Sequence, residues 1–220
     1  MDKLLCFIKF THREFADKLL KKGEIYFNLP SSFNKSGEME RGDDNEGAEW
    51  IDNSQITNIK VDHPTLGTFE FKTVPNSPSK LVQYNYYYLS FSLYSLTADL
   101  FEKDDSHKID SRMSEFGDSA VIIKEPYIFL NSIIEELKRT KINYEMKLVE
   151  YRDLTIGRVN LIPFDKKKEH HHHHEFRIII ENIENVPKKI EIGSIEKYSS
   201  LVNSKSIIES IWTIKRTPII

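Results

Sequence analysis

Residues 175–181, with the sequence EFRIIIE, constrain the fold more than any other stretch of the chain. Polar and apolar residues alternate at its start, which predicts a half-buried β-strand. Its apolar face comprises Phe176, Ile178 and Ile180. Its opposite face comprises His173, Glu175, Arg177 and Ile179. A carboxylate, a guanidinium and an imidazole on one face of a strand that looks central need either partners or a function.

Two simpler interpretations of this strand compete with a functional site. Glu175 and Arg177 are two positions apart, so they could form an exposed ion pair on an edge strand, which contributes little to stability. The five histidines 170–174 could be a solvated loop or an engineered tag, and such runs bind nickel or zinc without physiological purpose. Glu175 is our candidate catalytic residue, and the histidines are not assigned as a metal site.

Composition limits the class of protein. The 220 residues fit one domain, 1–220, and 39% hydrophobic with 30% charged residues is ordinary for a globular protein with a real core. The net charge of −3 gives no overall basic field, so nucleic acid would need a local patch. No stretch approaches the roughly 18 apolar residues of a membrane span, and no signal peptide is recognisable. The single cysteine, Cys6, lies in an apolar run, which fits a reducing cytosol. We therefore expect a cytoplasmic protein with no membrane partner.

The amino-terminal elements carry the clearest local signals. A strand is predicted over 4–10, followed by a helix that Thr11 would cap, with Glu14 completing a capping box. Lys21 and Lys22 followed by Gly23 are typical of a helix end. A short strand over 24–28 follows.

Many strands and few helices are predicted for the rest of the chain. Strands are expected at 82–92, 120–123, 144–151, 158–162 and 188–192, a hairpin at 59–71, and a helix from Pro126. Residues 101–117 are predicted to be a loop or a short helix, and 194–202 and 204–211 to be helical within an extension over about 194–220. This order favours an α+β fold with mixed and antiparallel sheets and a few flanking helices.

The segment from about 30 to 57 has no periodicity, and an irregular stretch of this length is usually functional or disordered. Six carboxylates lie between Glu38 and Glu49. Oxygen ligands at such spacing could hold magnesium or calcium, although residues 43–45 lack the spacing of an EF-hand. The alternative is a solvated acidic loop, and no metal ligands are assigned.

A third candidate region is the strand with Tyr88, Ser90 and Ser92 on one face. Aromatic rings stack against a nicotinamide or a base, and serine hydroxyls bond to an amide or a ribose. The alternative is a half-exposed strand with small polar residues. The P-loop, GxGxxG, G-x-S-x-G, HExxH and paired CxxC motifs are absent, which removes the common enzyme classes that they mark.

Several short motifs, in this order, resemble the DUF2971-like group of small bacterial proteins. The first is a strand and helix with the sequences FIKF at 7–10 and LLKKGEIYF at 19–27. The acidic RGDDNEG at 41–47 follows Phe33-Asn34, and SFS at 90–92 and EFRI at 175–178 come later. The resemblance spans most of residues 4–181.

The same order of parts looks like that of the ADP-ribosyltransferases. This resemblance implies the split-sheet fold of that superfamily and an enzyme with NAD as its substrate and Glu175 as its catalytic residue. That glutamate would bond to the ribose 2′-hydroxyl and stabilise the positive charge that develops as nicotinamide leaves. The residues implied to bind NAD are Lys9, His12, Tyr26, Arg41, Tyr88, Ser90, Ser92 and Arg177.

The sequence departs from the superfamily pattern at two positions. His173 stands two residues before the glutamate, where many arginine- and asparagine-modifying members have Glu or Gln, and the first-strand cation is Lys9, not Arg. The acceptor is therefore open between protein and nucleic acid. Members with this build often act as toxins or in phage defence, which implies an antitoxin or defence-system partner. The alternatives are a metal-dependent nuclease toxin that uses the acidic loop or the histidines, and a non-catalytic binding or sensor module that uses 30–57 for recognition.

Overall fold

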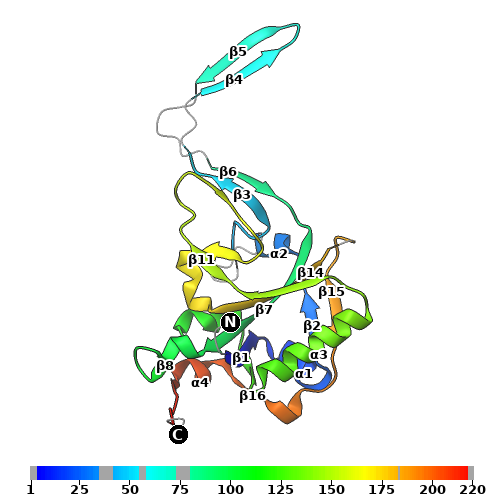
Figure 1. Cartoon of the computed structure of the whole chain (residues 1–220), viewed down its shortest axis with the longest axis vertical. Helices are drawn as coiled ribbons and strands as arrows, with labels where there is room; N and C mark the ends of the chain where they lie inside the picture. The colour runs from blue at the N-terminus through cyan, green and yellow to red at the C-terminus, as the bar shows by residue number, and fades with distance from the viewer. Residues whose placement is uncertain (1–3, 35–41, 55–57, 73–79, 183, 218–220) are drawn as a thin grey trace.

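A six-stranded sheet forms the centre of the protein, for which a computed structural model describes residues 4–34, 42–54, 58–72, 80–182 and 184–217 (Figure 1). Every neighbouring pair of its strands is antiparallel. In spatial order the strands are β10 (Tyr144–Leu148), β14 (Glu175–Glu181), β7 (Tyr88–Thr97), β1 (Leu4–Thr11), β9 (Ser119–Ile123) and β16 (Ser199–Asn203). The predicted strand at 175–181 is confirmed as an interior strand, so an exposed ion pair on an edge is excluded.

Two apolar cores cover the opposite faces of this sheet. Helices α1 (Arg13–Lys22) and α3 (Pro126–Arg139) pack on one face, where the Phe7 ring lies 5.0 Å from that of Phe176 and 6.5 Å from that of Phe129. The neighbouring residue Ile8 points to the other face and packs with Tyr94. The elements that cover this second face are η1 (Ala98–Phe101), η2 (Ser111–Phe116) and α4 (Ser204–Glu209).

Smaller sheets surround the central one. Two of them form the walls of the site described below: β2 (Glu24–Phe27) with β15 (Lys188–Glu191), and the parallel pair β11 (Glu150–Arg152) with β13 (Asp165–Lys167). The others are β3 (Ala48–Asp52) with β6 (Leu81–Tyr84) and β12 (Arg158–Asn160), and β8 (Ser106–Lys108) with β17 (Ile211–Thr213). The remaining short elements are α2 (Pro30–Asn34), η3 (Lys168–His173) and η4 (Glu196–Tyr198).

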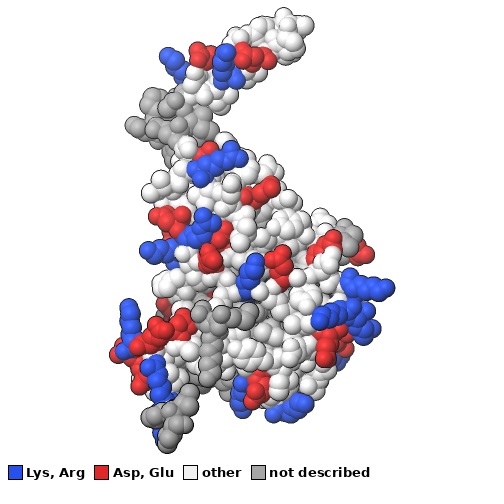
Figure 2. Space-filling view, in the orientation of Figure 1, with Lys and Arg blue, Asp and Glu red and all other residues white. Residues whose placement is uncertain are grey.

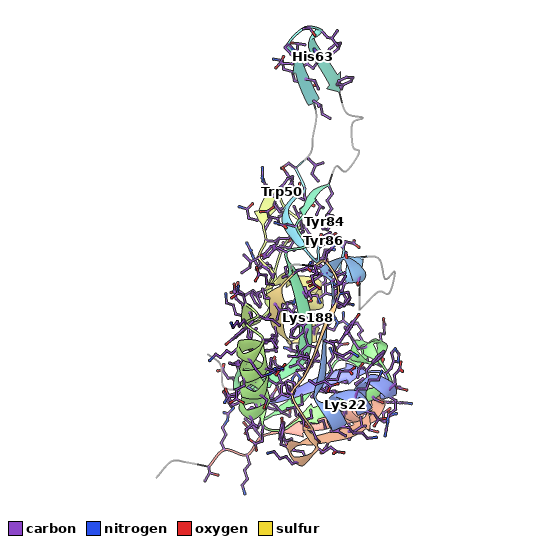
Figure 3. The ribbon with its side chains drawn as sticks, turned by 90° about the vertical axis from the view of Figure 1, so that its right-hand side faces the viewer. Lys22, Trp50, His63, Tyr84, Tyr86 and Lys188 are labelled. Carbon is purple, nitrogen blue, oxygen red and sulfur yellow. The ribbon has the colours of Figure 1, made fainter. Side chains whose placement is uncertain are left out.

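The hairpin predicted at 59–71 is present as β4 (Asn58–His63) and β5 (Gly67–Lys72), which extend away from the rest of the molecule (Figure 1). Figure 3 shows His63 on the hairpin, Trp50 and Tyr84 on the small sheet between the hairpin and the main body, and Tyr86 just after the end of β6. All residues of both strands are exposed.

The chain therefore has a mixed α+β fold with mostly antiparallel sheets and a few helices, as predicted. None of the helices in the described ranges is both long and apolar enough to cross a membrane.

The start of helix α1 differs from the prediction. Thr11 does not cap it, because Thr11 is still paired with Ser119 in the sheet. The N-cap residue is His12, and the backbone N–H of Arg13 donates instead to the carboxylate of Asp118, at 3.0 Å. A residue 105 positions away thus supplies the cap, which no local sequence signal encodes. The predicted end at Gly23 is confirmed, with φ of 61°.

Three other segments also differ from the predictions. The stretch 82–92 is not one strand, because β6 ends at Tyr84 and joins a different sheet from β7. The segment 30–57 contains α2 and β3. Residues 199–202, predicted to be helical, lie in strand β16, because this strand completes the central sheet beside β9. The helix predicted at 204–211 is confirmed as α4.

Strands β1 and β7 pair along only part of their length. Their pairing runs from Leu4 opposite Thr97 to Ile8 opposite Tyr94, after which β1 continues beside β9 and β7 beside β14. The ammonium of Lys9 bridges the separation by donating to the carbonyl of Ser92, at 2.7 Å. A gap therefore opens in the middle of the sheet.

Candidate functional site

A cavity with a volume of about 560 Å³ lies where β1 and β7 separate. One part of its wall is aromatic and apolar and comprises Phe15, Leu19, Tyr26, Phe33 and Phe91. The opposite part is charged and comprises Asp43, Glu46, Lys166, Glu175 and Arg177. Three lysines also line it, namely Lys9 of β1, Lys18 of α1 and Lys189 of β15, together with His12, the N-cap residue of α1. Its volume is in the range of small-molecule sites, and its lining combines ring surfaces with many charged and polar side chains.

Arg177 is the centre of the charged wall, and only 2% of it is exposed. Its Nε donates to Glu175 Oε1 at 2.7 Å, and its two terminal nitrogens donate to the two carboxylate oxygens of Glu46, at 2.8 and 3.0 Å. The Tyr88 hydroxyl donates to the same glutamate at 3.1 Å. The bidentate pairing fixes the orientation of the guanidinium, and with it the position of Glu175.

Glu175 is the carboxylate that is held ionised. Burial alone would raise the pKa of Glu175, but the charges of Arg177 and Lys166 outweigh it and hold the pKa well below its usual range. The Ser92 hydroxyl also donates to Oε1, and the Lys166 ammonium donates to Oε2 at 3.1 Å. Burial raises the pKa of Glu46, although Arg177 opposes this. Of the two buried glutamates, Glu175 is thus the one whose pKa is held low.

Lys166 links Glu175 to the histidine run. Its ammonium donates to Nδ1 of His173 at 3.2 Å, so this ring nitrogen carries no proton. Burial, together with the charge of Lys166, lowers the pKa of His173 to about 2. His172 and His173 are buried in η3, so the prediction of a wholly solvated loop at 170–174 is wrong.

The structure brings together most of the residues implied to bind NAD. The cavity lining includes Lys9, His12, Tyr26, Ser90, Ser92 and Arg177, together with the candidate catalytic residue Glu175. Tyr88 is not part of the lining, because its buried hydroxyl contacts Glu46 behind the cavity wall. Arg41 lies outside the described residues.

The described part of the acidic segment, residues 42–49, contributes Asp43 and Glu46 to the charged wall of the cavity. Asp43, Asn45 and Glu46 are buried, and Glu46 is the ion-pair partner of Arg177, so this part is not a solvated loop. Within the described ranges, no group of three or more His, Cys, Asp or Glu side chains has the geometry of a metal site.

Sequence reasoning missed Glu46 and Lys166 as site residues. Glu46 was one of six carboxylates in the acidic segment, and Lys166 begins the run KKK at 166–168. The one signal in the sequence was Arg177 itself, because an arginine on an interior strand needs anionic partners. Selecting Glu46 from the six carboxylates requires knowing which part of the acidic segment contacts Arg177 of β14.

The buried histidines are expected to make the free energy of unfolding decrease as the pH falls, at pH values above those at which carboxylates titrate. The folded pKa of His173 is lowered to about 2 and that of His174 to about 4, so the unfolded chain binds the protons first. The stability that these neutral histidines contribute to the folded state is fully present above about pH 6.5 and is lost as the pH falls. We expect a loss of about 1.4 kcal/mol per pH unit for each histidine between pH 6 and 5, measured by urea unfolding.

In the variant His173→Gln, unfolding should take up about one proton fewer, so the free energy of unfolding should depend less steeply on pH. Equal slopes for wild type and His173→Gln would contradict the assignment of His173 as a buried neutral residue.

Comparison with protein-family models, with curated proteins and with solved structures gives no match.

Proposed function

We propose that the chain is an NAD-dependent ADP-ribosyltransferase that modifies a protein or a nucleic acid. The observation that supports this most is an ionised, buried carboxylate, Glu175, in the wall of a cavity of about 560 Å³ that also offers aromatic surfaces and cations. The motif order that resembles this superfamily agrees with that placement. An antitoxin or a defence-system component as partner is part of the same proposal.

The residues present fit a dinucleotide. Phe15, Tyr26, Phe33 and Phe91 offer surfaces on which a nicotinamide or an adenine stacks. Lys9, Lys18 and Lys189 offer positive charge to a diphosphate, and these lysines and His12 offer hydrogen-bond donors. Since Ser92 donates its proton to Glu175, it presents lone pairs to an amide N–H of a ligand.

NAD supplies an activated bond between nicotinamide and the ribose C1′ carbon. In the transfer this bond breaks, nicotinamide leaves with the electron pair, and the acceptor bonds to C1′ and loses a proton. Glu175 contributes a negative charge that stabilises the positive charge developing at C1′. Its lowered pKa suits this electrostatic role and not that of a general acid.

Arg177 and Glu46 hold Glu175 in place, so no reorganisation is needed when the charge develops. A carboxylate accepts about four hydrogen bonds, and Ser92, Arg177 and Lys166 occupy three of these positions. The carboxylate therefore has capacity left for a ribose hydroxyl.

The test is transfer of label from NAD that is labelled in its adenosine part. The protein is incubated with separate protein, RNA and DNA fractions, and label is expected in one fraction together with release of nicotinamide. NAD at 100 times its Kd is also expected to add about 2.7 kcal/mol to stability, seen as a higher Tm. No label in any fraction together with no change in Tm would reject the proposal.

A further inference from the structure

A second cavity has a volume of about 230 Å³. Neighbouring residues of the same two segments line the two cavities. Glu46 and Lys166 line the first, whereas Asn45 and Lys167 line the second. Because side chains alternate along β13, successive lysines of one strand point into different cavities.

The lining of the second cavity has more cationic than anionic side chains. Its cations are Lys80, Arg152, Lys167 and Lys168, and its carboxylates are Asp153 and Glu169. Asp153 is engaged by its own turn, since Thr155 donates to it from both the backbone N–H, at 2.9 Å, and the hydroxyl. Arg152 is held in place by Asp165, at 2.8 Å. Figure 2 shows positive and negative side chains interspersed on the face in view. The larger number of cations in the second cavity therefore does not reflect a positive charge of that whole face.

Two of these cations are close enough to oppose each other. Burial lowers the pKa of Lys80, and the charge of Lys167 lowers it further, against the carboxylates of Asp44 and Asp43. The Lys80 ammonium donates to Asn45 Oδ1 at 2.7 Å, which leaves the amide nitrogen of Asn45 as a neutral donor beside the cations. Clustered ammonium groups with amide donors are a favourable environment for an anion that has several acceptor oxygens.

We propose that this second cavity binds a phosphate group. A volume of about 230 Å³ holds a phosphate or a phosphorylated sugar but is below the usual size of a site for a whole drug-sized ligand. The phosphate comes either from a free phosphorylated metabolite or from the backbone of a polynucleotide. This inference does not rest on the proposed transferase activity, because it uses different side chains.

The experiment measures binding of inorganic phosphate and of a short single-stranded RNA oligonucleotide to the full chain by calorimetry. The test variant is Lys80→Gln with Lys167→Gln, and the matched control is Lys60→Gln with Lys72→Gln, which removes two exposed lysines from the β4–β5 hairpin. Wild type and control should bind phosphate equally, and the test variant should bind at least about tenfold more weakly. The single variant Lys168→Gln, at an exposed position, should weaken binding without any change in folding.

The two sources of phosphate give different results. A polynucleotide binds more tightly than inorganic phosphate and with steep salt dependence, whereas a free metabolite site favours the small anion. Absence of saturable binding of both probes, or an equal loss in the test and control variants, would overturn the proposal.

Discussion

Replacing Glu175 with glutamine is expected to lower the rate of ADP-ribose transfer about 100- to 1,000-fold, because the neutral amide cannot stabilise positive charge at the ribose carbon. Binding of NAD should change little, since the aromatic wall and the cations remain. The measurement is kcat and KM for nicotinamide release together with label transfer.

The matched control is Glu145→Gln on the adjacent strand β10. Glu145 also lies two positions from a cation, Lys147, but its side chain is 61% exposed, so its removal should leave the rate unchanged. Arg177 keeps Glu46 and Lys166 keeps His173 in the Glu175→Gln variant, which preserves the fold. A Glu175→Gln protein as active as wild type would show that this carboxylate is structural.

Replacing Arg177 with methionine is expected to destabilise the protein by about 3–5 kcal/mol, because it leaves two buried carboxylates, Glu46 and Glu175, without their shared cation. The free energy of unfolding is measured by urea titration at pH 7. The surface control is Arg139→Met, which breaks a similarly short pair with Glu136 on α3. Because the Arg139 side chain is 72% exposed, we expect its removal to change the free energy of unfolding much less than the removal of Arg177.

The double variant Glu46→Gln with Arg177→Met identifies the source of this effect. If the cost comes from an unpaired buried charge, neutralising Glu46 should recover part of it, and the two changes should be non-additive by about 0.5–3 kcal/mol. Additive costs would mean that Arg177 stabilises the fold through packing and not through its pairing with Glu46.

The elements with strong local signals were predictable. The alternation in 175–181 correctly placed Phe176 in the core and Glu175 with Arg177 on the other face, since side-chain period depends only on the strand itself. The end of α1 at Gly23 and the hairpin β4–β5 follow from the same kind of short-range chemistry.

Signals of this kind failed where distant residues compete. Asp118, and not Thr11, accepts the hydrogen bond at the start of α1. Residues 199–203 form a strand because they pair with β9. The partners of Glu175 come from β7, β13 and β14, and Glu46 lies 131 positions from the arginine that it binds.

The amino-acid sequence by itself determined the α+β class, the two faces of β14 and the presence of a charged group on an interior strand. Only the tertiary structure decided that this group lines a cavity, that Glu175 is the carboxylate held ionised, and that Glu46 and Lys166 are its neighbours. The physical reason is range: periodicity and turn chemistry act over a few residues, whereas desolvation and ion pairing depend on which distant segments fold against each other.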